Sequence, residues 1–230
     1  MKPHVTCLMA TSVDGRILPR RWRPAGGSGG LFEKVHDEIG CDAWIVGRTT
    51  GQEFARGKPY TNSAAAPLPR ESHFVSKDAS AYGVVLDATG KIGWARADIG
   101  GDPIVAVLTK AVSDTHLQGL RDDGVSYIFA GDRTLDLAAT LETLNRELNV
   151  KRVLLEGGGV ANGAFLRAGL IDELALILCP TVDGARGAPC LFDSTDADAN
   201  VAAPVKVMTL LSSTAMDSGA VLLRYAIENG

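Results

Sequence analysis

A turn of three glycines follows Glu156, directly after a buried apolar run at residues 153–155. Glycine permits backbone conformations with positive φ and lets another molecule approach the backbone closely. Backbone amides at the start of a helix that follows such a turn attract anions. We therefore expect the stretch Gly157–Ala161 to hold the diphosphate of a dinucleotide. From the residues alone, a tight turn that binds nothing remains the alternative.

A second turn joins an apolar run at residues 43–46 to a probable helix. Gly47 ends the run, and Arg48, Thr49 and Thr50 open the helix. An arginine beside two hydroxyl groups suits a phosphate monoester, such as the 2′-phosphate of NADPH. The alternative is that Thr49 or Thr50 caps the helix while Arg48 lies in solvent.

A polar loop at residues 9–17 leaves the first apolar run. Ala10 is small enough for a flat ring to lie against the backbone, and Asp14 precedes Gly15, an arrangement that also suits a simple Asx turn. Four arginines lie in or after this loop: Arg16, Arg20, Arg21 and Arg23. They are too few for a nucleic-acid duplex but sufficient for one phosphate ester. A solvated basic loop is the alternative.

The composition sets limits on the class of protein. Over 230 residues, 46% are apolar and 22% are charged, as in an ordinary soluble globular protein. The net charge of −4 and the lack of a basic run argue against a nucleic-acid partner. The four cysteines form no CxxC pair, so we expect neither a metal site nor a redox pair. No signal pattern and no apolar run of ~20 residues is found, so we expect a cytoplasmic protein without a membrane partner.

The elements that must position these residues alternate along the chain. Strands are predicted at 5–9, 43–46, 84–86, 104–108, 126–129, 153–155, 174–178, 205–211 and 221–226. Helices are predicted at 31–39, 113–121, 135–148 and 160–168, with Ser113 as an N-cap. Surface loops are expected at 59–70 and 193–204. This order predicts one α/β domain over residues 1–230, with a mostly parallel central sheet, helices on both faces and an antiparallel C-terminal hairpin.

Taken together, these turns resemble the reductase domain of the riboflavin-biosynthesis deaminase/reductase family, itself related to dihydrofolate reductase. Residues 10–17 match the pattern A-x-S-x-D-G-x-I, and residues 42–50 match D-A-x-x-x-G-x-x-T. Residues 153–180 follow the order E-G-G, helix, L-x-x-G-L-x-D-E, strand, P. The resemblance spans most of the chain. It implies a dihydrofolate-reductase-like fold, NADPH as cofactor, a homodimer, and hydride transfer to the ribosyl C1′ of a phosphoribosylamino-pyrimidine in riboflavin synthesis.

The residue chemistry described above and the resemblance together suggest roles for individual residues. Glu156 and Asp14 are the expected catalytic residues. The expected cofactor contacts are Ala10, Gly47, Arg48, Thr49, Thr50, Asp87, Ala88, Gly157, Gly158, Gly159, Val160 and Ala161. The expected substrate contacts are Ser12, Trp22, Arg23 and Glu53. The histidines show no metal spacing, and His36 is interpreted as a surface or dimer-facing residue.

The sequence departs from the family pattern at several points. Gln52-Glu53-Phe54 stands where the family has D-D-P, which puts the identity of the substrate in question. The deaminase half is missing, and with it the H-x-E and P-C-x-x-C ligands that zinc needs there. A dihydrofolate or other pterin reductase is the alternative activity. A dinucleotide-binding module without chemistry, or a purely structural domain, are alternatives of other classes.

Overall fold

The computed structural model describes residues 1–26, 29–61 and 66–230. These residues form two compact units. The first unit comprises Met1–Pro3 and Asp42–Lys151, and the second comprises His4–Cys41 and Arg152–Gly230. No helix in the described part of the chain is both long enough and apolar enough to cross a membrane. Each unit is described by itself below.

The first unit is built on parallel strands. Its strands are β2 (Ala43–Gly47), β3 (Tyr82–Leu86), β5 (Asp102–Leu108) and β6 (Ser126–Phe129), and each pairs in parallel with the next. The short strand β4 (Asp98–Ile99) runs antiparallel to the start of β5. Helices α2 (Arg48–Phe54), α3 (Asp114–Asp122) and α4 (Leu137–Leu148) belong to this unit. The strands are almost wholly buried, as expected for a parallel sheet covered on both faces.

Side-chain caps fix two helices of the first unit. The Ser113 hydroxyl accepts a hydrogen bond from the His116 amide over 3.2 Å, which confirms the predicted N-cap of α3. Asp136 caps α4 in the same way, by accepting from the Ala139 amide over 2.9 Å. Helix α4 ends at Asn149, which takes a left-handed conformation with φ of 55°.

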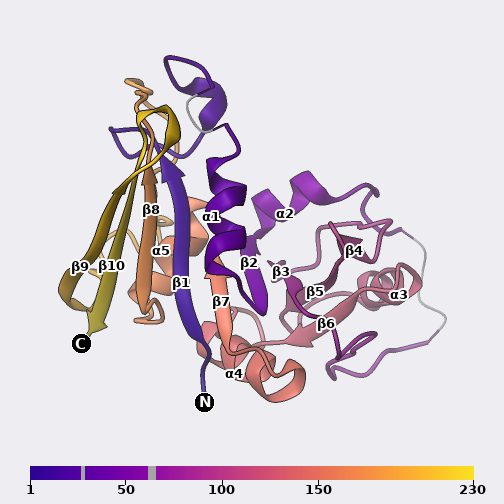
Figure 1. Ribbon diagram of the computed structural model, residues 1–230. Coiled ribbons are helices and arrows are strands. Elements are labelled where there is room, and N and C mark those ends of the chain that lie inside the picture. The colour runs from indigo at the N-terminus through magenta and orange to yellow at the C-terminus, as the bar shows by residue number, and fades with distance from the viewer. Residues whose placement is uncertain (27–28, 62–65) are drawn as a thin grey trace. The chain divides into compact units, whose positions relative to one another are not determined.

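The second unit combines parallel and antiparallel pairing. Its strands are β1 (His4–Thr11), β7 (Arg152–Leu155), β8 (Glu173–Leu178), β9 (Val205–Ala215) and β10 (Val221–Asn229). β1 lies between β7 and β8 in parallel, and β10 joins β8 to β9 in antiparallel fashion. Its helices are α1 (Leu31–Ile39) and α5 (Gly159–Arg167), with short 3-10 turns η1 (Pro19–Arg21) and η2 (Asp217–Gly219). Figure 1 shows β9 and β10 as the long C-terminal hairpin.

The predicted fold class is confirmed: both units are α/β, the pairing is mostly parallel, and the C-terminal hairpin is antiparallel. Strand β9 runs to Ala215, beyond the predicted end at Leu211, because a bulge lets pairing continue past an irregular step. The two-residue strand β4 was missed, since so short a segment has no readable alternation. Residues 62–65 of the predicted loop at 59–70 lie outside the described residues.

Candidate active site

The triple-glycine turn connects β7 to α5 in the second unit. Gly158 is the N-cap of α5 and has φ of 70°, which a residue with a side chain rarely adopts. The first helical hydrogen bond runs from the Asn162 amide to the Gly158 carbonyl over 3.0 Å. Among the described residues, no acceptor bonds the amides of Gly159, Val160 and Ala161. A turn with such free amides at a helix start fits the diphosphate of a dinucleotide.

A segment at residues 190–193, here called the strap, crosses the first turns of α5. The Asp193 amide donates to the Gly159 carbonyl over 2.8 Å. A Cβ on Gly159 would overlap the Cys190 carbonyl oxygen, and one on Gly163 would overlap the Asp193 carbonyl oxygen. Gly159 therefore has a packing reason as well as a predicted cofactor role. The strap was not predicted from the sequence, where its signal is the spacing of Gly159 and Gly163 along one helix face.

Glu156 lies between the glycine turn and the end of β7. Its side chain is 9% exposed, and its Oε1 lies 2.6 Å from Nδ1 of His36 on α1. Burial raises the pKa of Glu156, while the hydrogen bond and charge of His36 act in the opposite direction. The interpretation of His36 as a surface residue missed this contact. The structure instead brings its ring against the predicted catalytic carboxyl group.

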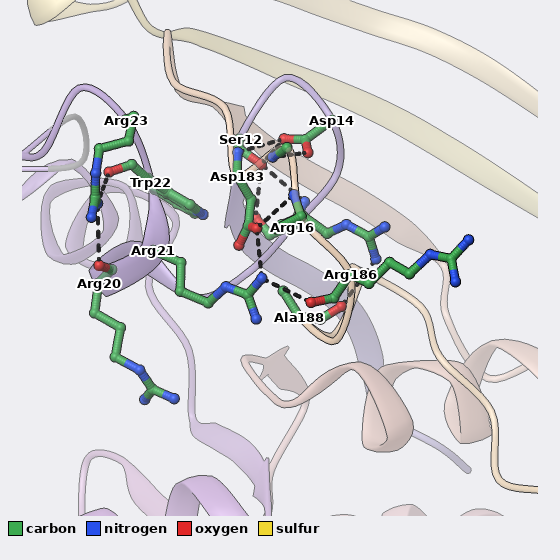
Figure 2. A network of polar contacts seen from close by, with 12 residues as sticks. Ser12, Asp14, Arg16, Arg20, Arg21, Trp22, Arg23, Asp183, Arg186 and Ala188 are labelled. Atoms are coloured by element: carbon green, nitrogen blue, oxygen red, sulfur yellow. Dashed lines mark hydrogen bonds and ion pairs between the residues drawn. The ribbon is translucent and has the colours of Figure 1, made fainter.

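Asp14 binds a second loop of the same unit, as Figure 2 shows. Its Oδ1 accepts from the Ser12 hydroxyl over 2.6 Å and from the Asp183 amide over 3.0 Å, and its Oδ2 accepts from the Gly184 amide over 3.0 Å. The Ser12 hydroxyl and these amides hold the pKa of Asp14 well below its usual range. The side chain thus stays ionised, which suits an anchor for the loop and not a proton donor.

The arginines near Asp14 divide into two kinds. Arg21 donates to the Asp183 carboxylate over 2.9 Å, and Arg16 donates to the Ala188 carbonyl over 3.0 Å (Figure 2). These two side chains hold the loops together. Arg20 and Arg23 are exposed, although Arg23 also donates to the Trp22 carbonyl over 2.8 Å. Arg20 and Arg23 are therefore accessible to a phosphate group from solution.

Trp22, a predicted substrate contact, is 1% exposed. Its indole nitrogen is buried without a hydrogen-bond partner among the described residues. The side chain therefore lies in the interior of the second unit. Ala10 lies half-buried on β1, opposite Ile177 of β8.

In the first unit, the turn after β2 carries the predicted phosphate contacts. Gly47 is the N-cap of α2, and no side chain caps the helix. The alternative in which Thr49 or Thr50 caps α2 is therefore wrong. Arg48 and Thr49 are exposed, as is Glu53 in the last turn of α2. Their side chains are open to a ligand from solution.

Asp87 and Ala88 follow β3, the neighbour of β2, so both turns leave the same edge of the first unit's parallel strands. Asp87 is 1% exposed, and its Oδ2 accepts from the amides of Lys91 and Ile92 over 2.7 and 2.9 Å. The Ala88 carbonyl accepts from the Thr109 hydroxyl over 2.7 Å. These contacts shape the turn after β3, so its backbone is what a ligand would meet.

Among the described residues, no group of three His, Cys, Asp or Glu side chains is arranged to hold a metal ion. The residues of the second unit that combine burial, charge and unbonded amides are Glu156, its partner His36 and the glycine turn. Glu156 and the glycine turn are the predicted members of this set. His36 was not predicted to be one of them.

Comparisons with known proteins place this geometry in a family. A protein of Methanothermobacter thermautotrophicus, named as a 2,5-diamino-6-ribosylamino-4(3H)-pyrimidinone 5′-phosphate reductase, is 26% identical over 205 residues, 86% of this chain and 87% of that protein. The structure of a pyrimidine reductase-like protein from Corynebacterium diphtheriae matches with a TM-score of 0.71 at 19% identity, covering 99% of this chain and 93% of that chain.

A deaminase/reductase from Thermotoga maritima matches with a TM-score of 0.60 at 17% identity. That match covers 99% of this chain but 57% of the other, so the match leaves a large part of that longer protein uncovered. These structural matches show that the chain shares the fold of those proteins. The family model described as the RibD C-terminal domain matches residues 3–222. The chain therefore belongs to the RibD C-terminal domain family.

Proposed function

We propose that this chain is an NADPH-dependent reductase that reduces a ribosylamino-pyrimidine 5′-phosphate at the ribosyl C1′, as a step of riboflavin synthesis. The observation that carries the proposal is the position of Glu156. This buried carboxyl group lies two residues before Gly158, the N-cap of a helix whose first amides are unbonded among the described residues. An anion cradle beside a buried acid suits the binding of a dinucleotide next to a group that handles protons. The name of the Methanothermobacter relative supports this class of substrate.

The residues present fit a nicotinamide dinucleotide phosphate. In the second unit, the amides of Gly159, Val160 and Ala161 suit a diphosphate. In the first unit, the exposed Arg48 suits a phosphate monoester such as the 2′-phosphate. When bound, the reduced cofactor supplies a hydride, and the protein supplies orientation and electrostatics. Well-placed reactants lower a barrier by roughly 7–11 kcal/mol, so no nucleophile is required.

The substrate side of the proposal uses the second unit. Arg20 and Arg23, which are exposed, would neutralise the sugar phosphate. Asp14 would keep the loop of Ser12 in place through its bonds to the amides of Asp183 and Gly184. Because Asp14 stays ionised, Glu156 is the residue to which we assign contact with the ribose and the transfer of a proton.

We also propose that the protein is a homodimer and resides in the cytoplasm. The exposed apolar side chains of the C-terminal hairpin support the first proposal: Met208 is 47% exposed and Leu210 is 52% exposed on the edge strand β9. The four free cysteines, two of them buried, support a reducing compartment.

The proposed function is tested by following NADPH oxidation with the pyrimidine phosphate and, separately, with dihydrofolate. We expect turnover with the pyrimidine only, and Glu156→Gln to lower kcat by about 10²–10⁴-fold while NADPH still binds. Binding is measured by thermal unfolding, since a ligand at a hundred times its Kd stabilises by about 2.7 kcal/mol. Turnover of dihydrofolate would instead identify a pterin reductase. Binding without turnover would identify a non-catalytic module.

A further inference from the structure

The contact between His36 and Glu156 joins two parts of the second unit that lie 120 residues apart in sequence. Helix α1 carries His36 and packs on β1, and β1 pairs with β7, which ends one residue before Glu156. The Nδ1–Oε1 separation of 2.6 Å is that of a charge-assisted hydrogen bond. The histidine side chain is 27% exposed and the glutamate side chain 9%. The ring thus connects the buried carboxyl group to solvent.

The surroundings of Glu156 favour a proton shared between Glu156 and His36. Burial raises the pKa of Glu156, the carboxylate of Glu33 on α1 raises it further, and His36 lowers it. Cys7 on β1 is the other titratable neighbour. Burial raises the pKa of its thiol far above the neutral range, and the Glu156 charge adds to this, so Cys7 stays a neutral thiol. Among these neighbours, His36 alone supplies a positive charge to share a proton with Glu156.

We propose that His36 is the solvent-side member of a proton relay, acting through Glu156 on the substrate. The inference rests on the proposed reductase function. The reaction needs one proton for each hydride, because the open-chain imine gains a hydride at C1′ and a proton at nitrogen. As the C1′–H bond forms, the electron pair of the C=N π bond forms the new N–H bond. The proton comes from the Glu156 carboxylic acid, whose O–H bond breaks. His36 then passes a proton from water back to Glu156. Glu156 is the catalytic residue in this step, and His36 is a positioning residue that keeps it oriented and supplied with protons.

The experiment compares three variants in the full chain. His36→Asn keeps an N–H donor near the position of Nδ1 but cannot carry a second proton. His36→Ala removes the ring, and Glu38→Gln changes an exposed residue of the same helix as a control. We expect about a hundredfold loss of kcat in both His36 variants, with little change in KM, and wild-type behaviour in Glu38→Gln. We also expect the alkaline fall of kcat, which marks loss of the shared proton, to disappear in His36→Asn.

Chemical rescue separates a relay from a merely structural role. Added imidazole should restore turnover in His36→Ala, and a series of substituted imidazoles should restore it to a degree that follows their own basicity. The proposal is overturned if His36→Asn keeps the wild-type kcat and pH profile, or if rescue is absent while that variant remains folded and binds NADPH.

A measurement without cofactor or substrate distinguishes failure of this inference from failure of the proposed function. The imidazole nitrogens of His36 are followed by NMR as the pH is raised, in the wild type and in Glu156→Gln. Because a carboxylate favours the protonated ring, His36 should lose its proton at lower pH in the variant. An unchanged titration of His36 would show that His36 and Glu156 do not share a proton, even if the chain proves to be a reductase. A shifted titration in a chain that reduces no pyrimidine would reject the proposed function and, with it, the catalytic step.

Discussion

The Gly184 amide donates a hydrogen bond to Oδ2 of Asp14 over 3.0 Å, although 170 residues separate the two. The Asp183 amide and the Ser12 hydroxyl donate to the other oxygen of the same carboxylate. One ionised side chain therefore fastens the loop after β1 to the loop after β8. Both loops carry residues that we assign to substrate binding or to their support.

The Asp14 contacts make the free energy of unfolding depend on pH in the acid range. The pKa of Asp14 is lower in the folded protein than in the unfolded chain, so the unfolded state binds more protons as the pH falls. The contribution of Asp14 to the free energy of unfolding is thus complete above the usual pKa of aspartate and is lost as the pH drops towards the folded value. We expect Asp14→Asn to remove this part of the acid dependence.

Chemical denaturation from neutral to strongly acid pH checks the prediction for Asp14. The difference between wild type and Asp14→Asn should shrink as the pH falls. Asp37→Asn, which removes an exposed carboxylate from α1, controls for the general loss of one charge. Hydrogen exchange at the amides of Asp183 and Gly184 should be faster in Asp14→Asn at neutral pH. Two stability curves that stay parallel over the whole range would contradict the assignment.

Because of the strap, replacing a helical glycine by alanine is predicted to destabilise the protein, the opposite of the usual effect. Replacing glycine by alanine in a helix interior ordinarily stabilises a protein by about 0.5–1 kcal/mol. At Gly163, the added Cβ would overlap the Asp193 carbonyl oxygen, a backbone atom that cannot rotate away. We expect Gly163→Ala to destabilise the protein by about 1–3 kcal/mol in a denaturant titration. A more stable variant would show that the strap does not rest on α5.

Much of the local structure could be predicted because its signal is local. Leu31 and Val35 recur on one face of α1 and are buried, and that spacing alone placed the helix at residues 31–39. The buried strand β5 contains a short apolar run at residues 104–108, which is the run that predicted it. The three consecutive glycines predicted the turn after β7, and Gly158 in that turn has a positive φ.

The rest of the site could not be predicted because its contacts join distant residues. No periodicity in the sequence pairs His36 with Glu156. A histidine on a helix and a glutamate after a strand can each lie in solvent, so their residue types alone do not predict a buried pair. The strap contacts Gly159 and Gly163 from a segment that was expected to open a surface loop at Asp193. The arginines after β1 formed a visible cluster, but only the fold shows that Arg21 is bound to Asp183 while Arg20 is exposed.

The choice between cofactors is predicted to depend on Arg48. Its guanidinium is exposed at the start of α2, where no other side chain caps the helix. A charged hydrogen bond to a 2′-phosphate contributes about 1.5–3 kcal/mol, so Arg48→Ala should reduce the preference for NADPH over NADH about tenfold to a hundredfold. The values of kcat/KM for both cofactors measure this. Arg56→Ala, which removes another exposed arginine of the first unit, should leave the preference unchanged. An equal loss with both cofactors would refute a 2′-phosphate contact.

The proposed homodimer is predicted to form through one face of the C-terminal hairpin. In the β9–β10 register, Met208 lies opposite Ile227 and Leu210 opposite Tyr225, so these four side chains share one face. Leu210→Lys places a charge in that face and should convert the dimer to a monomer in sedimentation experiments. Val207→Lys is the matched control. Val207 is 47% exposed and one residue from Met208, so it lies on the opposite face, and its replacement should leave the dimer intact. Because both lysines add the same charge to the same strand, a monomer in both variants would indicate general disruption of the edge. A dimer in both would place the interface elsewhere.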